Sequence, residues 1–144
     1  MLDSGKKSMI NKWFYAPPSQ LDRGLDIVRI AIALITLVHP VCRIIEGEVH
    51  GFGVFLSSDG FPLGVALAWF VTLFQSAASL AMIVRRLIVP ACIGNIIIFI
   101  FGIVLDHAHS GWFVVGGGTN GMEYSVTLIA CHVALLWAYW PRKE

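Results

Sequence analysis

The chain has 144 residues, of which 57% are hydrophobic and only 13% are charged. Soluble domains carry about 25% charged residues, so this composition excludes an ordinary soluble protein and favours a membrane bundle. The formal net charge of +1 also argues against a nucleic-acid partner, since proteins that bind nucleic acids are usually strongly basic.

Residues 1–23 form the first predicted element, a cytoplasmic arm in which Pro17 and Pro18 precede the first membrane span. That span is predicted over residues 24–46, and its apolar centre is the run Ile30–Val38. No Ala-x-Ala cleavage site follows this run. We therefore expect the span to stay in the membrane instead of being removed as a signal peptide.

Three further spans are predicted over residues 63–84, 87–105 and 123–140, none of which contains Lys, Arg or Asp. Each is close to the length of about 20 residues that crosses a bilayer. Short links between spans require antiparallel neighbours. The sequence therefore predicts an all-α fold, a transmembrane four-helix antiparallel bundle over residues 24–140.

Basic residues predict the orientation of this bundle. Outside the first span they occur before it, between the second and third spans, and in the tail: Lys6, Lys7, Lys12, Arg23, Arg85, Arg86, Arg142 and Lys143. The two longer loops, residues 47–62 and 106–122, contain no Lys or Arg. The positive-inside rule places both loops outside, and both termini, with the tail 141–144, in the cytoplasm. We expect a multi-pass protein of the bacterial inner membrane.

Every predicted span contains polar residues near its middle. Thr36 lies in the first span, Asn95 in the third and His132 in the fourth, and Arg29 lies nearer the cytoplasmic end of the first. Such groups are costly in hydrocarbon, so each is either a functional residue or a hydrogen-bonding group that joins helices. We expect Arg29 to pair with the nearby carboxylates of Asp26 and Asp22.

A second group of polar residues is predicted near the outer face, and its members could bind a ligand: His39, Arg43, Gln75, His107, His109 and Glu123. A quinone head needs hydrogen-bond donors, a group that exchanges protons and an apolar slot, all of which this group and the spans could supply. A metal ion needs three or four converging donors, and no compact pair complements His107 and His109. We predict no metal site.

The chain also lacks a recognisable electron carrier. The sequence contains no evident nucleotide-binding domain, haem motif or cysteine cluster. Its cysteines, Cys42, Cys92 and Cys131, fall in three different spans without a Cys-x-x-Cys motif. We expect no intrinsic cofactor, so any electrons would come from a partner protein.

The second outer loop is too apolar to extend freely into water. Trp112 and Phe113 lie in its first half, and Gly116–Gly118 permit a tight return toward the fourth span. We expect the loop to fold over the outer mouth of the bundle. Glu123 would then lie at the positive end of the last helix dipole and pair with Arg43.

This loop also carries a family resemblance. His109, Gly111–Phe113, Gly116–Gly118 and Gly121–Tyr124 together resemble the signature of the DoxX family of small four-helix membrane proteins. The resemblance extends over roughly residues 24–140 and implies an accessory membrane subunit of a redox complex. Besides the lipid bilayer, we expect a protein partner or a homo-oligomer. The alternative is a non-catalytic membrane scaffold or a small-solute carrier.

Overall fold

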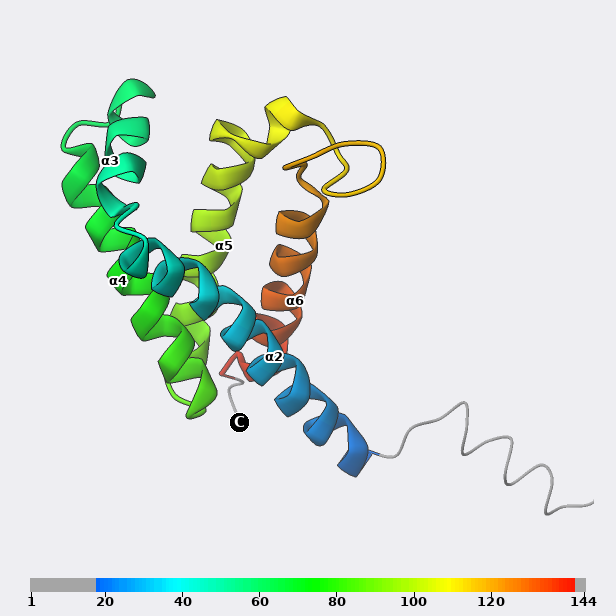
Figure 1. The fold of residues 1–144 in the computed structure, drawn as a ribbon. Helices are drawn as coiled ribbons and strands as arrows, with labels where there is room; N and C mark the ends of the chain where they lie inside the picture. The colour runs from blue at the N-terminus through cyan, green and yellow to red at the C-terminus, as the bar shows by residue number, and fades with distance from the viewer. Residues whose placement is uncertain (1–17, 142–144) are drawn as a thin grey trace, which may run out of the picture.

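The computed structural model describes residues 18–141, and all the regular structure in this part of the chain is helical (Figure 1). The helices, in chain order, are α2 (Pro18–Ile45), α3 (Val49–Ser58), α4 (Gly64–Ile83), α5 (Ile88–Leu105), the short 3-10 helix η1 (His107–Ser110) and α6 (Glu123–Tyr139). Most of the predicted arm, residues 1–17, and the end of the predicted tail, residues 142–144, lie outside the described residues.

Within the described residues, three helices, α2, α4 and α5, are long and apolar enough to cross a membrane. The fourth, α6, is apolar but shorter, with 17 residues. The helix bounds follow the predicted spans closely, except that α2 begins at Pro18 instead of residue 24. Proline is well tolerated there, because the first turn of a helix needs no amide donor. These helices indicate an all-α membrane protein.

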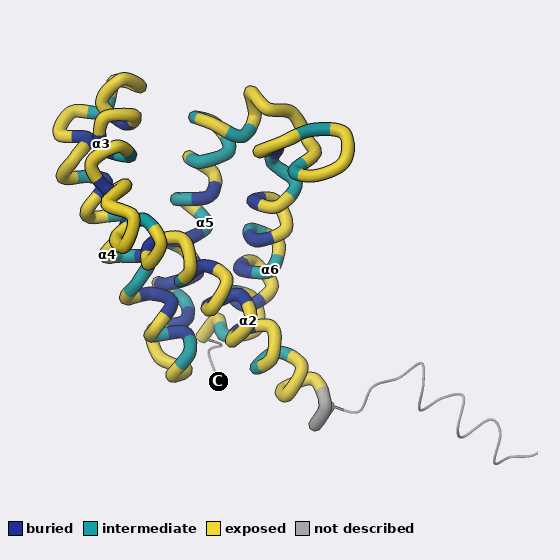
Figure 2. The backbone as a smooth tube through the Cα atoms, in the orientation of Figure 1, coloured by how far each residue is buried: buried dark blue, intermediate teal, exposed yellow. Residues whose placement is uncertain are grey.

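Large apolar side chains cover the outside of the helices, while small residues fill the inside. Figure 2 shows the buried segments mainly where the helices face one another. Ala33, Ala78, Ala91 and Cys92 form the main core with Met82 and a few larger neighbours. Small residues let helix backbones approach closely, which is how helices associate in lipid.

The long helices pack chiefly in two pairs, with α2 on α4 and α6 on α5, and α3 also packs on α4, whereas α2 and α6 touch only weakly. The pairs are joined by α4 and α5, where the ring of Phe74 occupies the space beside Gly94. A side chain at Gly94 would overlap this ring.

Arg29 joins α2 to the end of α4. Its guanidinium donates hydrogen bonds to the carbonyl oxygens of Met82 and Ile83, the latter at 2.9 Å, and pairs with Asp26 Oδ1 at 3.0 Å. Tyr139 Oη also donates to Asp26 Oδ1, at 3.2 Å, which ties in the end of α6. The predicted partner Asp26 is confirmed, while Asp22 forms no ion pair with Arg29.

The other predicted buried polar residues do not join the helices by hydrogen bonds. Thr36, Asn95 and His132 are fully buried, yet Thr36 Oγ1, both amide atoms of Asn95 and His132 Nε2 have no partner within residues 18–141. His132 Nδ1 lies 2.8 Å from the Leu128 carbonyl oxygen and so must carry the ring proton. Of the two roles left open for these residues, a hydrogen bond between helices is therefore not seen in the described part of the chain.

The segment between the first two long helices, predicted as a Gly- and Ser-rich loop, is largely the helix α3. Gly53 of this helix is a packing position, because a Cβ there would lie 2.5 Å from Val65 Cα on α4. Val49 and Leu56 are buried against Ala68 of α4. The glycine at position 53 is therefore explained by the close approach of the α4 backbone and not by a turn.

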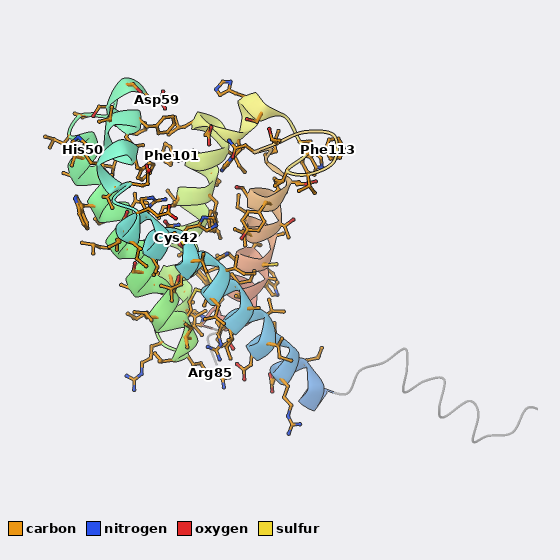
Figure 3. All side chains as sticks on the ribbon, viewed as in Figure 1. Cys42, His50, Asp59, Arg85, Phe101 and Phe113 are labelled. Carbon is orange, nitrogen blue, oxygen red and sulfur yellow. The ribbon has the colours of Figure 1, made fainter. Side chains whose placement is uncertain are left out.

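The two ends of the molecule are formed by different elements. The start of α2, the end of α6 and the link between α4 and α5 lie at one end, and α3 and the loop after η1 lie at the other (Figure 1). Figure 3 places Arg85 at the first end, opposite His50, Asp59 and Phe113.

Candidate functional site

A cavity of about 750 Å³ lies between the helices near α3 and the loop after η1. Its walls are mainly apolar and include six phenylalanines: Phe52, Phe55, Phe61, Phe70, Phe99 and Phe101. The rings of Phe61 and Phe101 meet edge to face with centroids 6.1 Å apart, and Figure 3 shows Phe101 between α3 and α5. The cavity thus offers an aromatic slot of the size that small-molecule sites use, about 300–1,000 Å³.

Arg43 brings a positive charge from α2 into this slot. Its Nη1 donates to Thr72 Oγ1 on α4 at 3.1 Å, and its guanidinium carbon lies 4.4 Å from the centroid of the Phe52 ring. The first contact is a single hydrogen bond and the second a cation–π contact, so several guanidinium donors stay available. Thr72 and Phe52 therefore hold Arg43 in position while leaving it able to bind an acceptor.

His39 and Gln75 face the same cavity from α2 and α4. The His39 ring lies 6.2 Å from the Tyr124 ring of α6, centroid to centroid, across the gap between the helix pairs. The Gln75 side chain is almost fully buried. Within residues 18–141 its amide has no protein hydrogen bond, and it lines the cavity with both donor and acceptor atoms.

His107 reaches the cavity from η1 and is fixed by the loop that follows. Its Nδ1 lies 3.1 Å from the Asn120 carbonyl oxygen, which can only accept, so this nitrogen carries a proton. Asn120 Nδ2 donates to Asp106 Oδ2 at 3.1 Å, and the same oxygen lies 3.6 Å from His107 Nδ1. In neutral His107, Nε2 is then the hydrogen-bond acceptor.

The structure brings His39, Arg43, Gln75 and His107 together at the cavity, but it leaves His109 and Glu123 outside. His109 is exposed on η1. Glu123 begins α6 as predicted, yet its Oε1 accepts a hydrogen bond from the Val114 backbone N–H at 2.9 Å. The predicted Glu123–Arg43 ion pair does not form, because Glu123 binds its own loop and Arg43 binds Thr72.

The loop after η1 does fold back on itself. The backbone N–H groups of Gly121, Met122 and Glu123 donate to the carbonyl oxygens of Phe113, Gly111 and Trp112, respectively, at 3.0–3.2 Å. Its inner side reaches the cavity through Val114, Asn120 and Gly121.

The prediction that Trp112 and Phe113 of this loop cover the mouth of the bundle is wrong. The Trp112 and Phe113 side chains are 51% and 52% exposed, whereas we expected them to cover the bundle mouth. Apolar character alone did not reveal that these rings are exposed.

The glycines of this loop have the spacing of a dinucleotide-binding fingerprint at Gly116, Gly118 and Gly121. In such proteins the motif follows a strand and opens a helix, whereas here it follows η1 after α5. A Cβ at Gly121 would collide with the backbone of Trp112 and Phe113. Gly121 therefore serves loop closure, and Gly116 has a positive φ of 81° at the return.

Several residues that line the cavity or position its polar groups were not among the predicted ligand-binding residues. Thr72 and Phe52 position Arg43, and Asn120 and Asp106 position His107. Tyr124 faces His39. The sequence gives no local signal for the Phe52 contact, because Arg43 lies nine residues before Phe52 in the chain.

Neither a search for metal-binding clusters nor a comparison with known proteins identifies further site residues. Among residues 18–141, no three His, Cys, Asp or Glu side chains lie close enough together to hold a metal ion. Comparison with family models, with curated proteins and with solved structures finds no match to this chain.

Proposed function

We propose that the chain is a four-span protein of a bacterial inner membrane, with both termini in the cytoplasm. The 17 residues of α6 extend about 25 Å at 1.5 Å per residue, close to the hydrocarbon thickness of about 30 Å. The link between α4 and α5, which contains Arg85 and Arg86, lies at one end of the molecule, while neither α3 nor residues 106–122 contain Lys or Arg. This asymmetry supports an outward position for α3 and the cavity.

We further propose that the cavity binds a quinone, or a similar small apolar ligand with a polar head, for a partner oxidoreductase. The observation that carries this proposal is the convergence of His39, Arg43, Gln75 and His107 on one aromatic slot. Arg43 and Gln75 would donate to the oxygens of the ligand head. His39 and His107 would exchange protons with it.

The resemblance to the DoxX family supports the same proposal. The Gly- and Trp-containing loop that carries the resemblance supplies Val114, Asn120 and Gly121 to the cavity wall. An accessory subunit that presents a ligand needs no electron carrier of its own, because a flavin- or haem-bearing partner supplies the electrons.

Photoaffinity labelling tests this proposal. The purified protein in nanodiscs is illuminated with a photoreactive short-chain quinone, and labelled peptides are identified by mass spectrometry. We expect adducts in the peptides that contain Gln75 or His107, and we expect excess unlabelled quinone to suppress them. Adducts confined to lipid-facing residues such as Trp137, which is 78% exposed, and insensitive to the competitor would refute the proposal.

A second candidate function is a non-catalytic scaffold or small-solute carrier, which the hydrogen bonds among Asp106, Asn120 and His107 favour. In that case these polar groups serve to hold the loop on the bundle. A folded protein that is not labelled in the cavity by any quinone would favour this candidate.

A further inference from the structure

Arg43 introduces an uncompensated positive charge into the cavity. Within residues 18–141 it has no carboxylate within ion-pair distance, and its partners are the Thr72 hydroxyl and the Phe52 ring. By contrast, Arg29 of the same helix is paired with Asp26. A buried or half-buried charge without a counter-ion is costly. A ligand that supplies the counter-ion therefore binds favourably.

The nearby carboxylates do not provide this counter-charge. Glu46 and Glu48 follow Arg43 closely in the chain, but both are exposed and neither lines the cavity. Asp106 does line it, yet its Oδ2 already accepts from Asn120 and lies beside His107. The two histidines of the wall, His39 and His107, can only add positive charge.

The rest of the cavity constrains the body of the ligand. The aromatic rings that surround Arg43 offer hydrocarbon contact, and a planar guanidinium matches a pair of anionic oxygens such as a carboxylate. The cavity is therefore polar and positive on one side and apolar elsewhere.

We infer that the ligand of this cavity is an amphiphilic anion, with a carboxylate or a chemically similar acidic head at Arg43 and an apolar body among the phenylalanines. This inference rests on the proposed function, since it names the class of ligand that the same cavity binds. The anionic head could belong to a free single-chain acid or to an anionic membrane lipid, which share the same oxygen chemistry at Arg43.

A matched pair of probes tests the inference. Binding of radiolabelled dodecanoate and of its methyl ester is measured by scintillation proximity on protein in nanodiscs of neutral phosphatidylcholine. Partitioning into empty nanodiscs is subtracted. We expect the acid to bind roughly tenfold more tightly than the ester, because a charged hydrogen-bonded pair is lost in the ester. Arg43→Gln should abolish this preference, Arg43→Lys should keep part of it, and Arg86→Gln at the opposite end should leave it unchanged.

The outcomes separate this inference from the proposed function. Equal binding of acid and ester, with both displaced by a short-chain quinone, overturns the anionic head and leaves the cavity as a quinone site. Failure of the acid, the ester and the quinone to bind the wild-type protein overturns both. Competition by phosphatidylglycerol in the nanodisc supports a lipid source for the anion, and its absence supports a free acid. The wild-type comparison decides the question even if Arg43→Gln fails to fold.

Discussion

At the scale of single residues, two of the arginines of α2, Arg29 and Arg43, have opposite surroundings. Arg29 is satisfied by Asp26 and by the last carbonyl groups of α4, whereas Arg43 contacts a hydroxyl and an aromatic ring. The first arrangement fastens α2 to α4 and complements the negative end of the α4 dipole. The second leaves donors directed at a cavity, which is the arrangement of a binding residue.

Arg29→Met tests the fastening role. The substitution removes hydrogen bonds to two main-chain oxygens and to Asp26, and a hydrogen bond to a charged group contributes about 1.5–3 kcal/mol. We expect the free energy of unfolding to fall by about 2 kcal/mol or more, seen as a lower melting temperature in detergent. Arg23→Met, at an exposed position on the same helix, is the control and should change little. Equal melting temperatures for the two variants would contradict this role.

The predicted site residues fall into two groups for a physical reason. His39, Arg43 and Gln75 lie on long helices, whose period of 3.6 residues fixes the direction of each side chain from the sequence alone. His107, His109 and Glu123 flank an irregular loop, where the direction of a side chain depends on which groups of the loop pair with one another. Of these three, only His107 reaches the cavity. The bond from Val114 N–H to Glu123 could not be read from residue spacing.

At the scale of elements, α3 decides the shape of the cavity. It contributes Phe52, Phe55 and Leu56 to the wall. Gly53 allows it to lie directly against Val65 at the start of α4. The spans were predictable from long apolar runs, but α3 was not, since Gly51 and Gly53 have the composition of a loop and nothing local reveals that α4 lies against them.

A pair of identical substitutions tests this packing. Gly53→Ala places a Cβ against the Val65 backbone, and overpacking of this kind costs about 1–3 kcal/mol. Gly51→Ala meets only the flexible end of the Glu48 side chain and removes a glycine from a helix, which stabilises by about 0.5–1 kcal/mol. We expect Gly53→Ala to lower both the melting temperature and quinone binding.

Gly51→Ala is the control for this test and should preserve or raise the melting temperature. If both alanine variants bind quinone as the wild type does and melt at the same temperature, the close approach of α3 to α4 does not shape the cavity.

At the scale of the whole molecule, the distribution of charge predicts how the chain lies in the membrane. Ser58→Cys on α3 and Arg86→Cys in the link between α4 and α5 lie at opposite ends (Figure 1). In a background with Cys42, Cys92 and Cys131 replaced by alanine, an impermeant thiol reagent added to intact cells should label only Ser58→Cys. Labelling of Arg86→Cys from outside would reverse the proposed orientation.

A single substitution at Gly102 of α5 tests whether the cavity holds a ligand. This residue lines the cavity, and a Cβ added there lies 3.8 Å from the nearest atom of the His107 ring, so a leucine side chain would project into the cavity without a clash at its base. Gly24→Leu on α2 is the matched control, because no atom lies within 4 Å of its added Cβ. Leucine also favours the helix over glycine at both positions.

Native mass spectrometry of the protein extracted with its own membrane lipids compares the wild type with these two variants. We expect the wild type and Gly24→Leu to carry one small apolar molecule that survives removal of the detergent, and Gly102→Leu to have lost it while keeping its melting temperature. A folded wild-type protein without any bound molecule, or a Gly102→Leu variant that retains it, would contradict a ligand in this cavity.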